Sequence, residues 1–427
     1  MRSTKFMRRR WTCSLLLLST LLASPSAFAQ TKGTLTHEVL WSFKRVGVPV
    51  PSPDGKWVVF SVSEVNYDAS KDVSDLWIAP GDGSDAPRRL TSSKGGESGP
   101  AWSADSTRLA FAAKRDDDEV AQIYVLNVAR SGEAQRITSA PTPAGAPTWS
   151  PDGKRVVFTA ALWPGATDEE ANRRAVQDRK NVKSKVRVYQ AFPIRNFDRW
   201  IDEARTHLWI VDADGDRRSR PLFAGSQLAG RPGYNGDSLS AAWAPDGQSI
   251  VFAAADNADA AAYAMVATSL WQVPAAGGEP TLLATTGWDI GAPRFSPDGK
   301  TVCFSASDSK AAIYALPRLA CASWPMAGQA PIRTVASELD RPVGSWAFAP
   351  DSRTVFFTAE DAGHERIYSA SALGGRATLV FDAPQGLYTG LGIPSRASST
   401  TVFANWESAV NPIEIVRLDP AARKRDS

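Results

Sequence analysis

Short apolar runs recur along the chain, and each is introduced by a similar polar phrase. The first copy reads Pro51-Ser-Pro-Asp-Gly-Lys-Trp-Val-Val-Phe60. Proline fixes φ and glycine can adopt a positive φ, so the phrase predicts a tight turn that leads into a β-strand. Five further copies occupy residues 102–111, 149–158, 243–252, 295–304 and 348–357.

The copies follow one another at a regular interval. Their aspartates are separated by 51, 47, 94, 52 and 53 residues, and stand at Asp54, Asp105, Asp152, Asp246, Asp298 and Asp351. A second apolar run, such as Leu208-Trp-Ile-Val211, and a short polar third run follow the phrase. Self-similarity of this kind predicts an all-β fold, a β-propeller of four-stranded blades with WD40-like or TolB-like repeats.

The number of blades depends on the two ends of the repeat region. Residues 401–416 resemble a further blade that lacks the Asp-Gly turn, which gives seven blades. Eight blades result if residues 38–48 contribute strands elsewhere. We expect seven, with the propeller covering residues 30–420 and residues 421–427 beginning a linker.

The 94-residue interval predicts that one blade carries an insertion, at about residues 162–205. The insertion is polar at first and then aromatic, with charged residues between the rings. Long insertions in repeat folds project from one face and often bind ligands. A hairpin or short helix that packs across the propeller is the alternative, and the two roles do not exclude each other.

The first 29 residues have the layout of a secretory signal peptide. A basic stretch that ends at Arg10 precedes the apolar run 15–22, and Ala27-Phe-Ala29 supplies the small residues of a cleavage site. We therefore expect export to the periplasm or beyond, with cleavage near Ala29. No cysteine stands where a lipoprotein signal needs one, so we expect no membrane anchor.

Removal of this peptide changes the net charge and the number of cysteines of the chain. Lys and Arg fall from 48 to 43 against 45 Asp and Glu, so the composition does not favour nucleic acid as a partner. Cys303 and Cys321 remain, and an exported protein could pair them. Cys303 replaces an inward-facing valine of the other repeats, however, so we expect two unpaired and buried cysteines.

The sequence carries little chemistry of its own. Each repeat offers one aspartate, which fits a turn that accepts backbone N–H bonds better than a calcium site with six or more oxygen ligands. The acidic residues 116–119 predict a solvated loop. The chain contains no G-x-S-x-G elbow, H-E-x-x-H motif, phosphate-binding loop or dinucleotide fingerprint. We therefore predict no catalytic residue, no metal and no cofactor.

Four stretches resemble the propeller half of the S9 (prolyl oligopeptidase) family, specifically bacterial dipeptidyl and acylaminoacyl peptidases: residues 40–49, 113–125, 199–211 and 411–419. The resemblance implies that a separate α/β-hydrolase domain supplies serine, aspartate and histidine. It also implies that the propeller limits access to short peptides. The chain ends at Ser427, about where that domain would begin, so we expect it to be inactive alone.

The resemblance favours a gating and substrate-selecting propeller that meets short peptide substrates through the missing hydrolase domain. The expected contacts lie in the insertion: Arg195, Arg199, Trp200, Asp202 and Glu203. A stand-alone TolB-like periplasmic binding protein is the alternative, although the repeats begin at Pro51, which leaves no room for a preceding small domain. A lyase site in the central channel would need acidic or histidine clusters that the sequence does not show. A homo-oligomer is left open.

Overall fold

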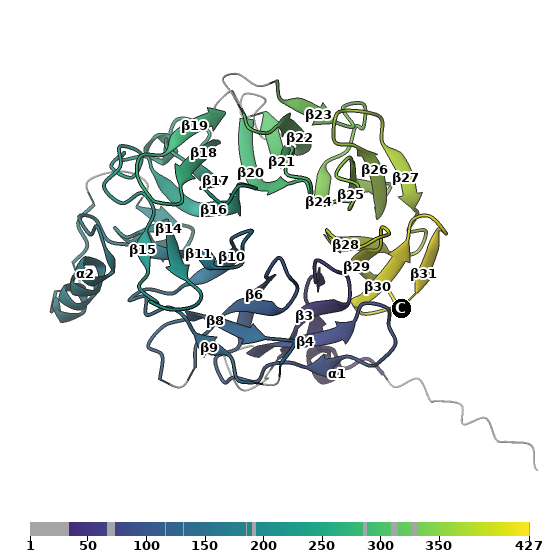
Figure 1. Cartoon of the computed structure of the whole chain (residues 1–427), viewed down its shortest axis with the longest axis horizontal. Helices are drawn as coiled ribbons and strands as arrows, with labels where there is room; N and C mark the ends of the chain where they lie inside the picture. Colours follow the sequence, from purple (N-terminus) through teal and green to yellow (C-terminus); the bar gives the residue numbers. More distant parts are fainter. Residues whose placement is uncertain are drawn as a thin grey trace, which may run out of the picture. The chain divides into compact units, whose positions relative to one another are not determined.

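The computed structural model describes residues 34–65, 73–115, 117–130, 132–184, 186–189, 194–284, 288–308, 315–326 and 331–426. The signal-like segment 1–29 lies outside them. The chain divides into two compact units, Met1–Leu40 and Trp41–Ser427, and helix α1 (His37–Ser42) spans the boundary. The strands of the second unit form seven antiparallel blades around a ring, as predicted (Figure 1). Six blades have four strands, and in the first blade two short strands, β1 and β2, both pair with β3.

The first three blades contain the strands up to β15. Blade 1 consists of β1 (Arg45–Val46), β2 (Val50–Pro51), β3 (Trp57–Glu64), β4 (Val73–Pro80) and β5 (Arg88–Arg89). Blade 2 consists of β6 (Glu97–Trp102), β7 (Arg108–Ala113), β8 (Gln122–Asn127) and β9 (Gln135–Arg136). Blade 3 consists of β10 (Gly145–Trp149), β11 (Arg155–Leu162), β14 (Arg205–Asp212) and β15 (Arg220–Pro221).

The remaining blades follow in chain order. Blade 4 holds β16 (Asn235–Trp243), β17 (Ser249–Ala255), the short helix η1 (Ala258–Ala260), β18 (Thr268–Pro274) and β19 (Thr281–Ala284). Blade 5 holds β20 (Trp288–Phe295), β21 (Thr301–Asp308), β22 (Arg318–Ser323) and β23 (Arg333–Val335). Blade 6 holds β24 (Val343–Phe348), β25 (Thr354–Asp361), β26 (His364–Ser371) and β27 (Thr378–Phe381). Blade 7 holds β28 (Leu387–Gly392), β29 (Val402–Glu407), β30 (Glu414–Asp419) and β31 (Lys424–Asp426).

The repeated phrase forms the turn between the first two strands of a blade. In blade 3, Asp152 Oδ1 accepts from the backbone N–H of Lys154 at 3.0 Å, and Ser150 Oγ accepts from that of Arg155 at 2.9 Å. Gly153 has φ +68°, where a side chain would be strained. The Ser150 hydroxyl and then the Lys154 amide lower the pKa of Asp152. The repeat aspartates thus cap their turns, as expected.

The aromatic residues of the phrase join one blade to the next. The indole N–H of Trp102 donates to Val50 O at 3.0 Å, that of Trp149 to Ala101 O at 3.1 Å and that of Trp243 to Thr148 O at 3.0 Å. The phenylalanines near the other end of the phrase are fully buried between blades: Phe111, Phe158, Phe252, Phe304 and Phe357. Each phrase therefore supplies a turn, a core residue and, in three blades, a link to the preceding blade.

Blades 1 and 7 close the ring by face-to-face packing. Val58 and Phe60 pack with Phe403 in one buried cluster. The side chain of Asn405 donates to Val46 O at 3.4 Å and to Gly47 O at 3.3 Å. Because β1 pairs with β3 inside blade 1, residues 45–46 do not start an eighth blade.

Two expectations from the sequence are wrong. Residues 424–426 were expected in a linker but form β31, which pairs with β30. Outer strands are held by backbone hydrogen bonds and are largely exposed, so a charged Lys-Arg-Asp strand carries no apolar signal. Cys303 and Cys321 were expected to be unpaired but form a disulfide. Both are buried as predicted, and they lie directly opposite each other on β21 and β22.

Candidate functional site

One edge of the blades, called the loop face here, carries the connections between second and third strands and those that lead to the next blade. It includes the described residues of the ranges 90–96, 114–121, 137–144 and 163–204. The Ser-Pro-Asp-Gly turns lie at the opposite ends of the same strands. Leu162 at the end of β11 pairs with Arg205 at the start of β14, so the insertion leaves the blade on the loop face.

The first half of the insertion is helix α2 (Glu169–Asn181), which projects beside blade 3 in Figure 1. Asp168 caps it, since its Oδ1 accepts from the Ala171 N–H at 2.7 Å. The buried Asn172 holds the helix to β11: its Nδ2 donates to Ala161 O at 3.0 Å, and its Oδ1 accepts from the Trp163 N–H at 2.9 Å. The helix is therefore fixed to the blade by these polar contacts, together with Ala171, which packs against the apolar cluster of the blade.

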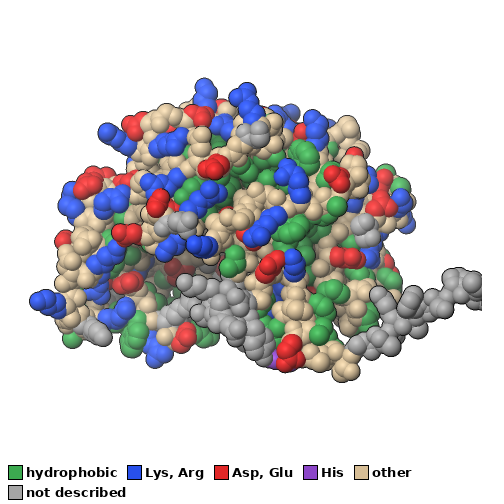
Figure 2. Space-filling view, turned by 90° about the horizontal axis from the view of Figure 1, so that it is seen from below, with side chains coloured by type: hydrophobic (Ala, Val, Ile, Leu, Met, Phe, Trp, Pro, Cys, Tyr) green, Lys and Arg blue, Asp and Glu red, His purple; other side chains and the backbone are tan. Residues whose placement is uncertain are grey.

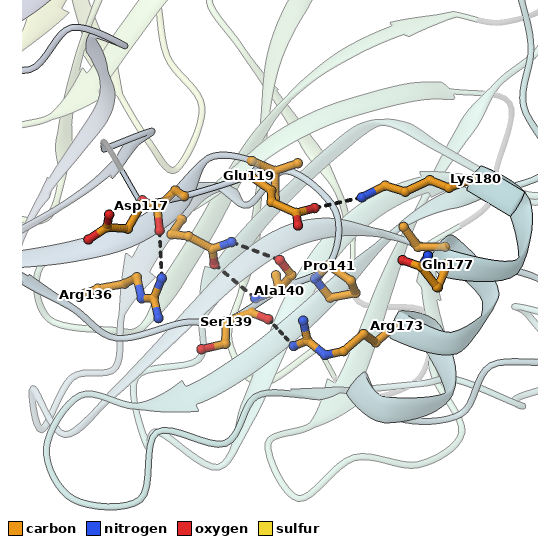
Figure 3. Close-up of a pocket in the computed structure, with 13 residues that line it drawn as sticks. Asp117, Glu119, Arg136, Ser139, Ala140, Pro141, Arg173, Gln177 and Lys180 are labelled. Atoms are coloured by element: carbon orange, nitrogen blue, oxygen red, sulfur yellow. Dashed lines mark hydrogen bonds and ion pairs between the residues drawn. The ribbon is translucent and has the colours of Figure 1, made fainter.

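A cavity of about 400 Å³ lies between α2 and the loops of blade 2 (Figure 3). Lys180 of the helix meets Glu119 of the loop at 2.7 Å, and the Arg173 guanidinium donates to Ser139 O at 2.5 Å. On the side of the molecule drawn in Figure 2, basic and acidic side chains are likewise interspersed. One ion pair and one hydrogen bond thus tie the insertion to a second blade.

The acidic loop at this cavity differs from the expectation of a solvated segment. Asp118 is buried, with the Arg136 guanidinium at 2.7 Å from Oδ1 and the Tyr124 hydroxyl at 2.6 Å from Oδ2. Burial and the bond to Asp118 raise the pKa of Tyr124 to about 12. Asp117 and Glu119 are exposed, and Asp116 lies outside the described residues. The sequence could not show that Arg136, two strands later, would reach back to the loop.

The second half of the insertion is a hairpin of β12 (Arg195–Asn196) and β13 (Arg199–Trp200). Arg195 pairs with Trp200 across it, and the Arg195 guanidinium lies over the Trp200 ring, 5.1 Å from its centroid. Tyr189 stacks on the same indole, with ring centroids 6.0 Å apart. Trp200 remains 51% exposed and Phe197, at the turn, 95% exposed. The hairpin therefore presents an aromatic surface flanked by a cation.

The other predicted contacts lie at or beside this hairpin. Asp202 forms an ion pair with Arg187 at 3.8 Å, and its carbonyl accepts from Arg205. Glu203 is exposed. Arg199 belongs to β13, but its side chain is outside the described part of the structure. A cation, an aromatic face and a carboxylate can bind a peptide-like ligand, and they include no nucleophile.

A second cavity, of about 580 Å³, lies on the loop face between blades 1 and 2. Asp75, Arg89, Ser93 and Arg115 are among its lining residues. Asp75 is only 3% exposed and is paired with Arg89. Glu97, 2% exposed, accepts from the Thr91 hydroxyl at 2.6 Å, and burial raises its pKa. Sequence reasoning missed this cluster, although an alignment of the repeats places Glu97 where the next blade has an alanine.

Comparisons with known proteins support the fold. A family model described as PD40, TolB beta propeller domain, matches residues 23–162. Acylaminoacyl peptidase from Pyrococcus horikoshii aligns with a TM-score of 0.63 at 14% identity, covering 91% of this chain and 52% of that one. The β-propeller domain of the trilobed protease from Pyrococcus furiosus aligns with a TM-score of 0.60 at 14% identity, covering 90% and 97%.

In sequence, dipeptidyl-peptidase 5 from Porphyromonas gingivalis is 36% identical over 88 residues, which are 21% of this chain and 13% of that protein. The chain spans about half the length of the Pyrococcus horikoshii peptidase. The fold is thus a TolB-like β-propeller with seven blades. More particularly, it resembles the propeller domains of S9-type peptidases, as the sequence indicated. Among the described residues, no helix combines the length and hydropathy that a membrane span requires.

Proposed function

We propose that this chain is the gating and substrate-selecting propeller of an exported S9-type serine peptidase that cleaves short peptides as a dipeptidyl or acylaminoacyl peptidase. The alignment with the Pyrococcus horikoshii enzyme carries the proposal, because it covers 91% of this chain but only 52% of a peptidase. The 36% identity with part of a dipeptidyl-peptidase supports the same class. In this proposal the catalytic groups belong to a separate hydrolase domain, and the chain alone is inactive.

The hairpin of the insertion would contact the substrate. Its half-exposed Trp200 contacts both Arg195 and Tyr189, so little side-chain freedom is lost when a peptide packs on it. Asp202 lies two residues further along and would attract a cationic group. This arrangement is suited to orienting a short peptide.

Export is proposed from the signal-like segment 1–29, and the disulfide Cys303–Cys321 is consistent with an oxidising compartment. The mass of the protein recovered from periplasm or medium tests this step. Loss of the first 29 residues is the expected result, and a cytosolic protein that keeps them would contradict it.

The activity is tested on the protein isolated from its source with antibodies against the propeller. An active-site fluorophosphonate probe should label the captured polypeptide or a subunit bound to it, and this material should cleave dipeptidyl or acylaminoacyl p-nitroanilides. Captured material that has neither the label nor turnover would overturn the proposal.

The substrate role of the hairpin is tested on that active form. Trp200→Ala should raise KM about tenfold with kcat retained, because an aromatic and cation–π contact is lost. Arg174→Ala is the control: Arg174 is exposed on α2 and pairs only with Glu170 among the contacts described, at 3.4 Å. Equal effects of the two variants would remove the hairpin from the substrate path.

A stand-alone TolB-like binding protein is the second candidate, and the match of residues 23–162 to the TolB propeller model favours it. Recovery of a stable envelope partner in place of a labelled hydrolase would support this candidate.

A further inference from the structure

Four buried polar atoms at the junction of blades 1 and 2 lack a partner in hydrogen-bonding geometry. They are Asp75 Oδ1, Ser93 Oγ, Glu97 Oε1 and Arg115 Nε. Asp75, Ser93 and Arg115 line the 580 Å³ cavity, and Glu97 lies behind this lining. Burial, the hydroxyls of Thr91 and Ser93 and then the charges of Asp75 and Arg115 act on the pKa of Glu97. Buried polar groups are nearly always satisfied, so four exceptions at one place require an explanation.

The next junction shows that the blade does not need these groups. Leu76 of β4 and Ile123 of β8 occupy the same position, since their N–H groups donate to Thr91 Oγ1 and Thr138 Oγ1 at 3.0 and 2.9 Å. Asp75 and Gln122, which precede these two residues, are therefore equivalent positions of the repeat. Gln122 is fully used: Oε1 accepts from Thr138 Oγ1 and the Ala140 N–H, and Nε2 donates to Ala140 O.

The other three groups have apolar counterparts. Ser93, Glu97 and Arg115 correspond in the repeat to Ala140, Ala144 and Leu162. These three apolar residues are buried together in one hydrophobic cluster. At the junction of blades 1 and 2, four polar residues therefore replace three apolar residues and one fully hydrogen-bonded glutamine of the next junction.

The chemistry of the set indicates what would fill the cavity. Two carboxylates present unused acceptor oxygens, so the complementary group carries several N–H donors and a positive charge. Asp75 already has one cationic partner, Arg89, on Oδ2, but Oδ1 is left over. No group of three or more metal-ligating side chains occurs among the described residues, which argues for an organic cation here.

We propose that the cavity between blades 1 and 2 binds a primary ammonium group, with Asp75 and Glu97 as its acceptors. Arg115 and Ser93 border the same site and offer hydrogen bonds to an oxygen carried next to the ammonium. The site lies in blades 1 and 2, whereas the hairpin of the proposed function belongs to blade 3, so the two can be tested separately.

The test titrates the intact protein with n-butylammonium chloride, followed by calorimetry or by amide chemical shifts. Tetramethylammonium chloride at the same ionic strength is the matched probe, because it has the charge but no N–H donor. Saturable binding of n-butylammonium that tetramethylammonium does not reproduce is the expected result. Equal responses to both salts, or no saturation with either, would overturn the proposal and leave the cavity to water.

A triple variant that copies the next junction locates the site. Asp75→Gln, Ser93→Ala and Glu97→Ala together install the residues of blades 2 and 3 at three of the four equivalent positions, with Arg115 retained. Thermal unfolding establishes that the variant folds before binding is measured. Binding of n-butylammonium should fall at least tenfold. A folded triple variant that binds as the native protein does would show that the ammonium site lies elsewhere.

Two single variants complete the test. Lys94 lines the same cavity and is exposed, so Lys94→Met removes the chain's own nearby ammonium and should bind n-butylammonium at least as tightly as the native chain. Glu119→Gln removes an exposed carboxylate at the neighbouring cavity and should leave binding unchanged. Loss of binding in either variant would contradict the assignment to Asp75 and Glu97.

Discussion

The junction between blades 1 and 2 and the junction between blades 2 and 3 follow the same backbone plan with different side-chain chemistry. In both, a threonine hydroxyl accepts from the third strand, through Thr91 in one and Thr138 in the other. That hydroxyl then donates to Glu97 in the first junction, at 2.6 Å, and to Gln122 in the second, at 2.7 Å. Glu97 thus accepts the threonine hydrogen bond that Gln122 accepts in the next repeat. Asp75, the residue equivalent to Gln122, therefore keeps one carboxylate oxygen without a hydrogen-bond partner.

This difference teaches how a repeat fold acquires a specific site. The positions that make a blade, such as the capped turn and the buried strand residues, are kept in both junctions. Positions where the loop face meets the blade are free to change, because the backbone bonds there are already complete. A polar group that the repeat does not require is therefore a stronger indication of function than a polar group that every blade shares.

The largest effect on stability is expected when Gln122, at the junction of blades 2 and 3, is replaced by the aspartate found at the equivalent position between blades 1 and 2. Gln122→Asp removes the donor to Ala140 O and buries a carboxylate without a cation, so the free energy of unfolding should fall by about 3–4 kcal/mol. Urea unfolding measures it. The reverse change, Asp75→Gln, removes the ion pair with Arg89 but also a buried acceptor without a partner, and should cost less, about 1–2 kcal/mol. Similar losses from the two changes would mean that the junctions do not differ in polar satisfaction.

The second largest effect concerns His207, whose titration contributes to the loss of stability in acid. This contribution has to be removed before the two junctions are compared at low pH. Burial lowers the pKa of His207 to about 4 from 6.5, and its Nδ1 is unpartnered beside Phe223 and Tyr234. The unfolded chain binds this proton first, so stability falls as the pH drops from 6.5 to about 4. His207→Phe should remove about 3 kcal/mol of that loss, seen as a flatter stability–pH curve. An unchanged acid limb in His207→Phe would contradict the buried neutral histidine.

The next effect concerns the satisfied carboxylate of blade 2. Asp118→Asn keeps the shape but loses the charge that pairs with Arg136, and should cost about 2 kcal/mol at pH 7. Hydrogen bonds from Tyr124 and Arg136 outweigh burial and lower the pKa of Asp118, so its contribution is present above the unfolded value of 3.8 and is lost as pH falls through the folded pKa. Thermal unfolding at pH 7 and pH 2 measures both. Glu119→Gln removes the exposed ion pair with Lys180 and should lower the free energy of unfolding by less than about 0.5 kcal/mol.

The smallest effect has the opposite sign. The pKa of Glu97 is raised, mainly by burial, so the ionised form is disfavoured in the folded protein. Its penalty is present above the folded pKa and disappears below the unfolded value of 4.5. Glu97→Gln should therefore raise the stability at pH 7 by about 1 kcal/mol and make no difference in acid below pH 4.5, as chemical unfolding at the two pH values would show. A loss of stability at pH 7 would mean that the Glu97 carboxylate is satisfied after all.

Much of the fold could be predicted because the information is local. The phrase around Asp152 contains its own turn, cap and strand, so six copies were enough to indicate the blades. Residues 401–416 lack the Asp-Gly turn, and their apolar strands alone indicated a seventh blade. The errors arose where the partner is distant or the strand is polar: β31 has no apolar alternation, and Asp118 is buried because Arg136 reaches back to it.

The sequence by itself determined the repeat and the place of the insertion and favoured seven blades over eight, since these follow from the spacing of turns and apolar runs. The pairing of β1 with β3 then excluded the eighth blade. Only the tertiary structure decided that Cys303 faces Cys321 across two strands and that Arg195 lies over Trp200. It also decided that Asp75 Oδ1, Glu97 Oε1 and Arg115 Nε gather at one junction, each buried without a hydrogen-bond partner. The physical reason is that hydrogen bonding and burial depend on which strands become neighbours, and a one-dimensional pattern records each residue's own face but not the side chain opposite.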